Sequence, residues 1–213
     1  MSDARAEAAG VLKRPKWSHK ARMSQLSLCA ARTRILTIAF LFPESADNDW
    51  FNLLVAKVSQ HGCCHVELVF EDDMSFSIFA NSKLFFKPRT FANPEYKLVS
   101  LSVSNMEYMA AYSYCAAAMS HEITFNELGI YAAYLQPCPM LYTRPSVETG
   151  HTFCSKIVTE ALQAGGLPEA EYLEPCRTTP SVLYEALHAS GRRVHHSVTF
   201  KMEQLRQVGA VVC

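Results

Sequence analysis

The sequence predicts an α+β fold in which the first half of the chain supplies an antiparallel sheet and the second half supplies mostly helices. Short runs of β-forming residues with alternating apolar and polar side chains gather in the first half. Apolar residues at helical spacing dominate the second half. The 213 residues are 49% hydrophobic and 19% charged, so they can bury a sizeable core. We expect a single domain over residues 33–213, preceded by a flexible basic tail over residues 1–32.

Four segments of the first half have the pattern of strands. Residues 34–42 are dense in β-forming side chains and end at a proline, which indicates a buried strand. In residues 64–70 and 75–81, which flank an acidic turn, apolar side chains alternate with mainly polar ones. They predict a β-hairpin with one apolar and one mainly polar face. Residues 96–103 predict a further strand.

Helices are indicated by apolar side chains at helical spacing and by signals at the helix ends. In the first of them, Asp47 or Asn48 is a suitable N-cap and Gly62 is a natural stop. Thr179 followed by Pro180 marks the start of the last one, because proline is favoured at the first helical position. We therefore expect helices at residues 47–60, 105–121, 125–135 and 152–163 and from residue 179 onward, a Pro-rich loop over 137–150, and a last strand at 194–200.

The charges are unevenly distributed although they cancel overall. The first 34 residues hold eight basic and two acidic side chains, a local charge of +6. The remaining residues hold twelve basic and eighteen acidic side chains, a local charge of −6. A mildly acidic folded part offers no basic surface for nucleic acid. The basic start is compatible with a mitochondrial presequence or with peripheral contact to an anionic membrane, and a flexible tail is the favoured interpretation.

The eight cysteines are expected to be free thiols in a reducing, cytoplasmic compartment. Residues 1–10 are small and polar, and no cleavable apolar region follows them, so no secretory signal is expected. The strongest apolar run, residues 35–42, is too short to span a bilayer as a helix. Cys63 and Cys64 are adjacent, a poor arrangement for a disulfide between them.

Cys154 is the candidate nucleophile. Its segment, residues 152–163, has the apolar spacing of a helix buried on one side, and Cys154 lies in the first turn, directly after a loop. A thiol there sits at the positive end of the helix dipole, which favours the nucleophilic thiolate. The backbone N–H of Cys154 is a suitable oxyanion donor, because amides at a helix start are unpaired. The alternative interpretation is a small buried thiol.

His65 is the candidate base among eight histidines, because it lies on a predicted strand with a carboxylate two residues away. Its side chain is on the face opposite the apolar stripe. If that stripe packs on the helices, His65 should be exposed to solvent. Catalysis therefore requires the polar face to meet the start of the Cys154 helix.

A third group should orient the imidazole, and three residues can do so. Glu67 shares the His65 face but lies about 6.6 Å along the strand, which is long for a direct contact. Asn81 and Ser77 are on the matching face of the partner strand, and a suitable register sets Asn81 opposite His65. Glu67 ranks first by chemistry.

These segments resemble the circularly permuted branch of the NlpC-like papain superfamily. Its hallmark is a histidine strand before a cysteine helix, here His65–Phe70 and Phe153–Leu162. The branch includes the YiiX-like bacterial proteins, their poxvirus relatives and the lecithin–retinol acyltransferase group. Phe125 and Asn126 match a weaker aromatic–polar pair of YiiX-like sequences. The resemblance covers roughly residues 33–166.

The resemblance implies a papain-like cysteine hydrolase of the peptidase or amidase type, with Cys154 and His65 as its dyad and no metal or organic cofactor. It implies a peptide, amide or lipid-ester substrate, so a lipid acyltransferase or thioesterase of the same fold is the second class. This chain departs from YiiX-like sequences at Glu67, where they usually have glycine. It also lacks the glutamate that they tend to carry on the following strand, here residues 77–80.

Two other interpretations compete with an enzyme. Zinc ligands could be drawn from His61, Cys63, Cys64 and His65, but neighbouring side chains on a strand face opposite ways. A catalytically dead module could bind a lipid or a protein, with Met140, Leu141 and Tyr142 of the Pro-rich loop as an apolar lip over the site.

Overall fold

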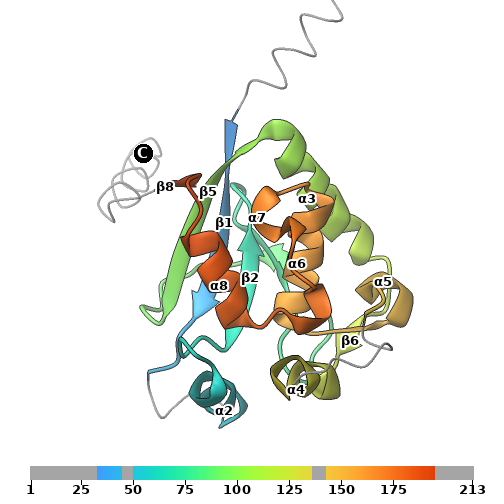
Figure 1. Ribbon diagram of the computed structural model, residues 1–213. Helices are drawn as coiled ribbons and strands as arrows, with labels where there is room; N and C mark the ends of the chain where they lie inside the picture. The colour runs from blue at the N-terminus through green and yellow to red at the C-terminus, as the bar shows by residue number, and fades with distance from the viewer. Residues whose placement is uncertain (1–32, 45–49, 136–142, 195–213) are drawn as a thin grey trace, which may run out of the picture.

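A six-stranded sheet organises the protein in the computed structural model, which describes residues 33–44, 50–135 and 143–194 (Figure 1). The strand order is β4-β3-β2-β1-β5-β8, and the neighbours pair antiparallel. The α+β class and the antiparallel sheet in the first half are therefore confirmed. The strands are β1 (Thr33–Leu41), β2 (His65–Val69), β3 (Met74–Ser77), β4 (Phe85–Pro88), β5 (Tyr96–Ser104) and β8 (Arg193–Val194).

Helices cover one face of this sheet and one of its ends (Figure 1), and most of them follow β5 in the chain. A short parallel pair, β6 (Thr124–Phe125) and β7 (His151–Thr152), joins two of the connections between them. None of the described helices is long and apolar enough to cross a membrane. The helices are α2 (Trp50–Val58), α3 (Asn105–Ala118), α4 (Glu127–Leu135), α5 (Ser146–Thr149), α6 (Cys154–Ala164), α7 (Pro168–Glu171) and α8 (Pro180–His188), with a 3-10 turn η2 (Pro175–Arg177).

Two apolar clusters hold the helices on the sheet. In the larger one, alternate residues of the central strands, such as Phe40 and Leu68, pack with Ile157 of α6 and Ala111 of α3. The smaller one lies where β1 ends and β2 begins, and α2 and α4 are at that end of the molecule (Figure 1). Its buried members are Leu41, Val55, Cys64, Ile130, Ala133 and Phe153. The start of α6 belongs to both clusters, because Cys154 is in the first and Phe153 in the second.

Several helix ends follow the expected local chemistry. Thr179 accepts a hydrogen bond from the Val182 amide at 3.3 Å, so the predicted start of the last helix is confirmed. A capping box closes the start of α3, where Ser104 and Glu107 bond each other's backbone amides.

The hairpin after β2 is shorter than predicted. β3 ends at Ser77 because the chain turns at Phe79, whose backbone amide and carbonyl both bond the Ser82 hydroxyl. Asn81 has a φ of 55°, a left-handed value that a strand does not allow. The strand expected over residues 75–81 is therefore wrong in its second half, and β4 was not predicted. Of the last strand, expected over 194–200, only Arg193–Val194 is described, and the other residues lie outside the described part of the chain.

Gly165 allows α3 and α6 to approach each other closely. A Cβ there would lie 3.0 Å from the Glu107 carbonyl oxygen and 3.2 Å from the Ala111 Cβ. We expect Gly165→Ala to lower the free energy of unfolding by about 1–3 kcal/mol, because backbone and a short side chain cannot move aside as a flexible one does. Urea unfolding measures this. Gly191→Ala is the control, because a Cβ at Gly191 would meet no atom within 4 Å. Equal effects of the two substitutions would contradict the close approach.

Candidate active site

Cys154 is the first residue of α6. The chain enters the helix from β7, which is fixed by the Asn126 amide donating to the Thr152 carbonyl at 2.7 Å. Phe153 is the N-cap in an extended conformation, and its side chain makes no capping hydrogen bond. The amides of the first turn are thus left without a side-chain cap, as the sequence suggested for an oxyanion donor. Cys154 itself is 2% exposed.

His65 is the first residue of β2 and is buried beside Cys154. Burial alone would lower the pKa of its imidazole, but the neighbouring Cys154 and Glu67 side chains raise that pKa to about 9. The two predicted site residues are therefore brought together, with the imidazole favoured in its charged form.

The expectation that His65 would be exposed if the apolar stripe packed on the helices is wrong. Val66 and Leu68 do pack in the cluster that contains the α6 residues, yet His65 is only 4% exposed. The reason is its place at the end of the strand. His65 pairs with Leu41, so both side chains lie on the face of the sheet away from the main helix layer. Leu41 packs with Phe153 in the smaller apolar cluster, which covers that face at this end of the sheet. The ring can thus meet the start of α6.

Glu67 lies beside His65 in the same buried cluster. Its Oε1 is 3.6 Å from Nε2 of His65, an ion-pair distance slightly longer than a hydrogen bond. The sequence-based separation of about 6.6 Å describes the backbone, whereas side chains two residues apart on one face can lean together. Because Nε2 faces Glu67, Nδ1 is the ring nitrogen left for the Cys154 thiol.

Three further groups hold the Glu67 carboxylate, which has no exposed surface. Ser75 donates to Oε2 at 2.6 Å, the Tyr96 hydroxyl donates to Oε1 at 3.2 Å, and Arg89 Nε lies 3.3 Å from Oε2. Burial works to raise the pKa of Glu67, but His65, Ser75 and Arg89 together lower it below its ordinary value. Glu67 is therefore a buried carboxylate oriented by several partners.

The other two candidates for the third group are not in contact with the imidazole. Ser77 donates to the backbone carbonyl of Val66 at 2.6 Å. The pairs Leu68–Phe76 and Val69–Ser75 set the register of the hairpin, which places Phe79 and not Asn81 opposite His65. The Phe79 ring stacks on the imidazole with centroids 4.3 Å apart. The register that the sequence suggested is thus wrong by two residues.

The neighbours of Glu67 and His65 were missed by the sequence analysis. Arg89 directly follows strand β4, which was not predicted. Phe79 lies in the predicted strand 75–81 but beyond Ser77, where the observed strand β3 ends. Ser75 and Tyr96 lie on predicted strands, but nothing in their local pattern distinguishes them from ordinary strand residues.

The neighbouring cysteines are in different surroundings from Cys154. Cys63 and Cys64 donate to the carbonyls of His65 and Leu41 at 3.5 and 3.6 Å. Burial raises the pKa of both thiols, so they stay protonated. His61 is turned toward Glu185 on α8. No three His, Cys, Asp or Glu side chains of the described residues are grouped to hold a metal ion, so the zinc interpretation finds no ligand set there.

The Pro-rich loop is anchored to α6 near the candidate site. The Ser146 amide lies 3.1 Å from Glu160 Oε1, and Lys156 donates to the Arg144 carbonyl at 2.7 Å. Part of the expected loop is the short helix α5. The predicted apolar lip of Met140, Leu141 and Tyr142 lies outside the described residues.

Comparison with known proteins assigns no family to this chain. No family model matches it, and the searches of curated proteins and of solved structures each found no significant match. The fold and the site define an α+β protein with a buried Cys154–His65–Glu67 cluster at a helix start.

Proposed function

We propose that this protein is a papain-like cysteine hydrolase of the peptidase or amidase type. The observation that carries the proposal is the buried His65 imidazole beside Cys154 at the start of α6, with the Glu67 carboxylate 3.6 Å from Nε2 of the imidazole. A thiol, a base and an orienting carboxylate in this order are the parts that a cysteine hydrolase requires. The proposal includes a substrate with an amide or ester carbonyl.

The geometry supports a two-step reaction. The Cys154 thiolate, whose proton His65 holds, attacks the carbonyl carbon, and the oxyanion is stabilised by the uncapped amides of the α6 start. His65 gives its proton to the leaving amine or alcohol as the C–N or C–O bond breaks. His65 then accepts a proton from the incoming water, whose oxygen attacks the thioester carbonyl; the C–S bond breaks, the acid leaves, and Cys154 is released as the thiolate beside the protonated His65. Glu67 keeps the imidazole oriented throughout and stabilises its charged form.

The reactivity of Cys154 toward iodoacetamide tests the dyad. We expect alkylation of Cys154 at about pH 6.5 to be at least tenfold faster in the parent than in His65→Ala, because the proposed proton transfer to His65 favours the nucleophilic thiolate. A small reagent is needed because Cys154 is buried. Mass spectrometry of the labelled peptides gives the rate for each cysteine across the pH range.

His65→Ala should abolish this advantage, and His61→Ala is its matched control. His61 is a histidine of the same region that pairs with Glu185 instead of a thiol. If Cys154 reacts like an ordinary or buried thiol in the parent and in His65→Ala alike, the catalytic proposal is wrong, and the domain acts as a binding module.

A lipid acyltransferase or thioesterase is the second candidate, and one observation favours it. Leu54 and Val58 of α2 and Leu128 of α4 are exposed by 40%, 58% and 70%, and both helices lie at the end of the sheet where β2 begins (Figure 1). Apolar surface near the thiol suits an acyl chain. Faster turnover of a long-chain than of a short-chain thioester would select this class, and turnover of a peptide amide would select the first.

A further inference from the structure

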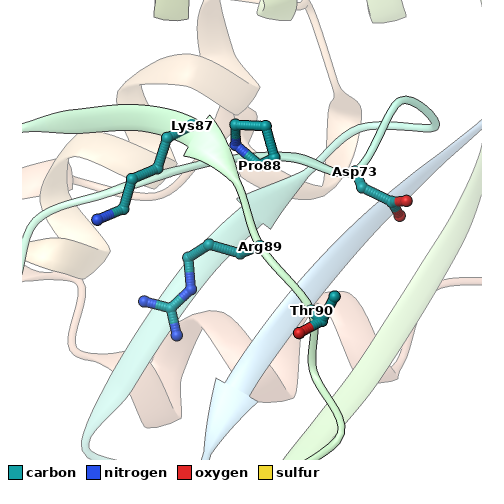
Figure 2. Close-up of a pocket in the computed structure, with 5 residues that line it drawn as sticks. All are labelled: Asp73, Lys87, Pro88, Arg89 and Thr90. Atoms are coloured by element: carbon teal, nitrogen blue, oxygen red, sulfur yellow. The ribbon is translucent and has the colours of Figure 1, made fainter.

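The connection between β4 and β5 must cross the sheet. β4 is an edge strand, whereas β5 lies on the far side of β1, so residues 89–95 pass over β3, β2 and β1. Figure 2 shows this segment leaving β4 through Pro88, Arg89 and Thr90 and running in front of the strands. Its two ends both contact the buried carboxylate of Glu67, Arg89 at the beginning and Tyr96 just after the end. The crossing therefore covers Glu67.

Arg89 is held in one orientation by contacts on several sides. Its guanidinium lies over the rings of Phe79, Phe85 and Phe91, at 5.0, 5.8 and 5.6 Å from their centroids. Its Nε faces Oε2 of Glu67 at 3.3 Å. The side chain is 24% exposed, at the edge of an open cleft of about 630 Å³ that Lys87 and Thr90 also line (Figure 2). Arg89 thus connects a solvent-exposed cleft with a buried carboxylate.

The same aromatic group also positions the imidazole. Phe79 stacks on His65 at 4.3 Å, and Phe85 stacks on Phe79 at 5.2 Å, with both ring pairs within 20° of parallel. Arg89 lies over Phe79 and Phe85 while it contacts Glu67. The imidazole and the carboxylate are therefore both fixed against one assembly of rings and guanidinium.

Arg89 differs from the other partners of Glu67 in its charge. Ser75 and Tyr96 donate neutral hydrogen bonds, whereas Arg89 places a permanent cation beside a carboxylate with no exposed surface. A buried carboxylate without a cation tends to take up a proton, and it would then no longer stabilise the imidazolium. His65 is the other cation near Glu67, but its charge is the one that the reaction uses.

We propose that Arg89 is a positioning residue of the candidate active site, which holds the Glu67 carboxylate against His65. The inference rests on the proposed function and adds to it a residue outside the Cys154–His65–Glu67 cluster. Arg89 acts through Glu67 and His65 and does not contact the thiol among the described interactions.

Two readouts in Arg89→Met test this inference. The first is the titration of the Glu67 carboxyl followed by carbon NMR, which should move to higher pH than in the parent, because the neighbouring cation is gone. The second is the pH profile of Cys154 alkylation, whose acidic limb should move the same way and lower the rate at about pH 5 roughly tenfold. Arg89→Lys should show a smaller change in both, because it retains the charge but loses the planar group over the rings.

Arg34→Met is the matched control. Arg34 also lies over an aromatic ring, Tyr108 at 4.1 Å, and also pairs through Nε with a carboxylate, Glu71 at 2.6 Å, but it does not contact the candidate site. This variant should leave the Glu67 titration and the Cys154 profile unchanged. A Glu67 titration that is the same in Arg89→Met as in the parent would overturn the inference. If Arg89→Met does not fold, an unmoved titration in Arg89→Gln, which also removes the cation, would overturn it.

The two readouts separate this inference from the proposed function. A His65-dependent Cys154 profile with an unmoved Glu67 titration in Arg89→Met keeps the hydrolase proposal and overturns the role of Arg89. A Cys154 profile without His65 dependence, combined with a moved Glu67 titration, overturns the hydrolase proposal and supports the Arg89–Glu67 contact.

Discussion

Cys154→Ala should lower the hydrolysis of an activated ester such as p-nitrophenyl acetate by about 10³-fold or more, because loss of the nucleophile removes the covalent step. The substitution removes one sulfur atom from the start of α6 and leaves the capping geometry of Phe153 unchanged. Release of p-nitrophenolate, followed spectroscopically with purified protein, gives the rate. The folded state of the variant is checked by its thermal unfolding.

Cys115→Ala is the matched control for Cys154→Ala. Cys115 is a fully buried thiol in α3, and burial raises its pKa well above the ordinary value, so it stays protonated. Its loss should leave ester hydrolysis unchanged. If Cys154→Ala retains the activity of the parent, the nucleophile lies elsewhere and the proposed function is wrong.

The site residues that were found from the sequence are those with a strong local pattern. Cys154 is identified by a helical apolar period that begins at the preceding residue, Phe153, and His65 by a strand with a carboxylate at the next position on its face. Both patterns depend on residues within one element. The sheet class and the start of α8 were predicted for the same reason.

The residues around Glu67 could not be found in this way, because long-range topology brings them together. Arg89 and Tyr96 meet Glu67 only because β4 is an edge strand and the chain crosses back over the sheet to β5. The turn at Phe79 also shortened the hairpin, which changed the residue opposite His65. Strand order and a local turn therefore decided the surroundings of the dyad, and neither follows from hydrophobic alternation.

Glu67→Gln should lower the free energy of unfolding by about 3–5 kcal/mol at mildly acidic pH, because it leaves the His65 and Arg89 cations without their buried carboxylate. Glutamine has nearly the same shape, so the loss reports charge and hydrogen bonding instead of a cavity. Ser75 and Tyr96 donate to different oxygens of the carboxylate, and glutamine has only one oxygen, so one of the two hydroxyls would face an amide NH2 that cannot accept its hydrogen bond. Urea unfolding of the parent and the variant measures the difference. Glu71→Gln, at an exposed ion pair with Arg34, is the control and should change stability little.

The pH dependence of that difference follows from the direction of two pKa shifts. The pKa of Glu67 is lowered in the folded protein, so its contribution is present above the ordinary value of 4.5 and is lost as the pH falls through the folded value. The pKa of His65 is raised from 6.5 to about 9, so its contribution is full below 6.5 and is lost as the pH rises through about 9. The gap between the parent and Glu67→Gln should therefore be widest between pH 4.5 and 6.5 and narrow on both sides. If the difference in free energy of unfolding between the parent and Glu67→Gln stays constant from acid to alkaline pH, the charges of Glu67 and His65 do not stabilise the fold. The proposed stabilisation by the buried ion pair would then be wrong.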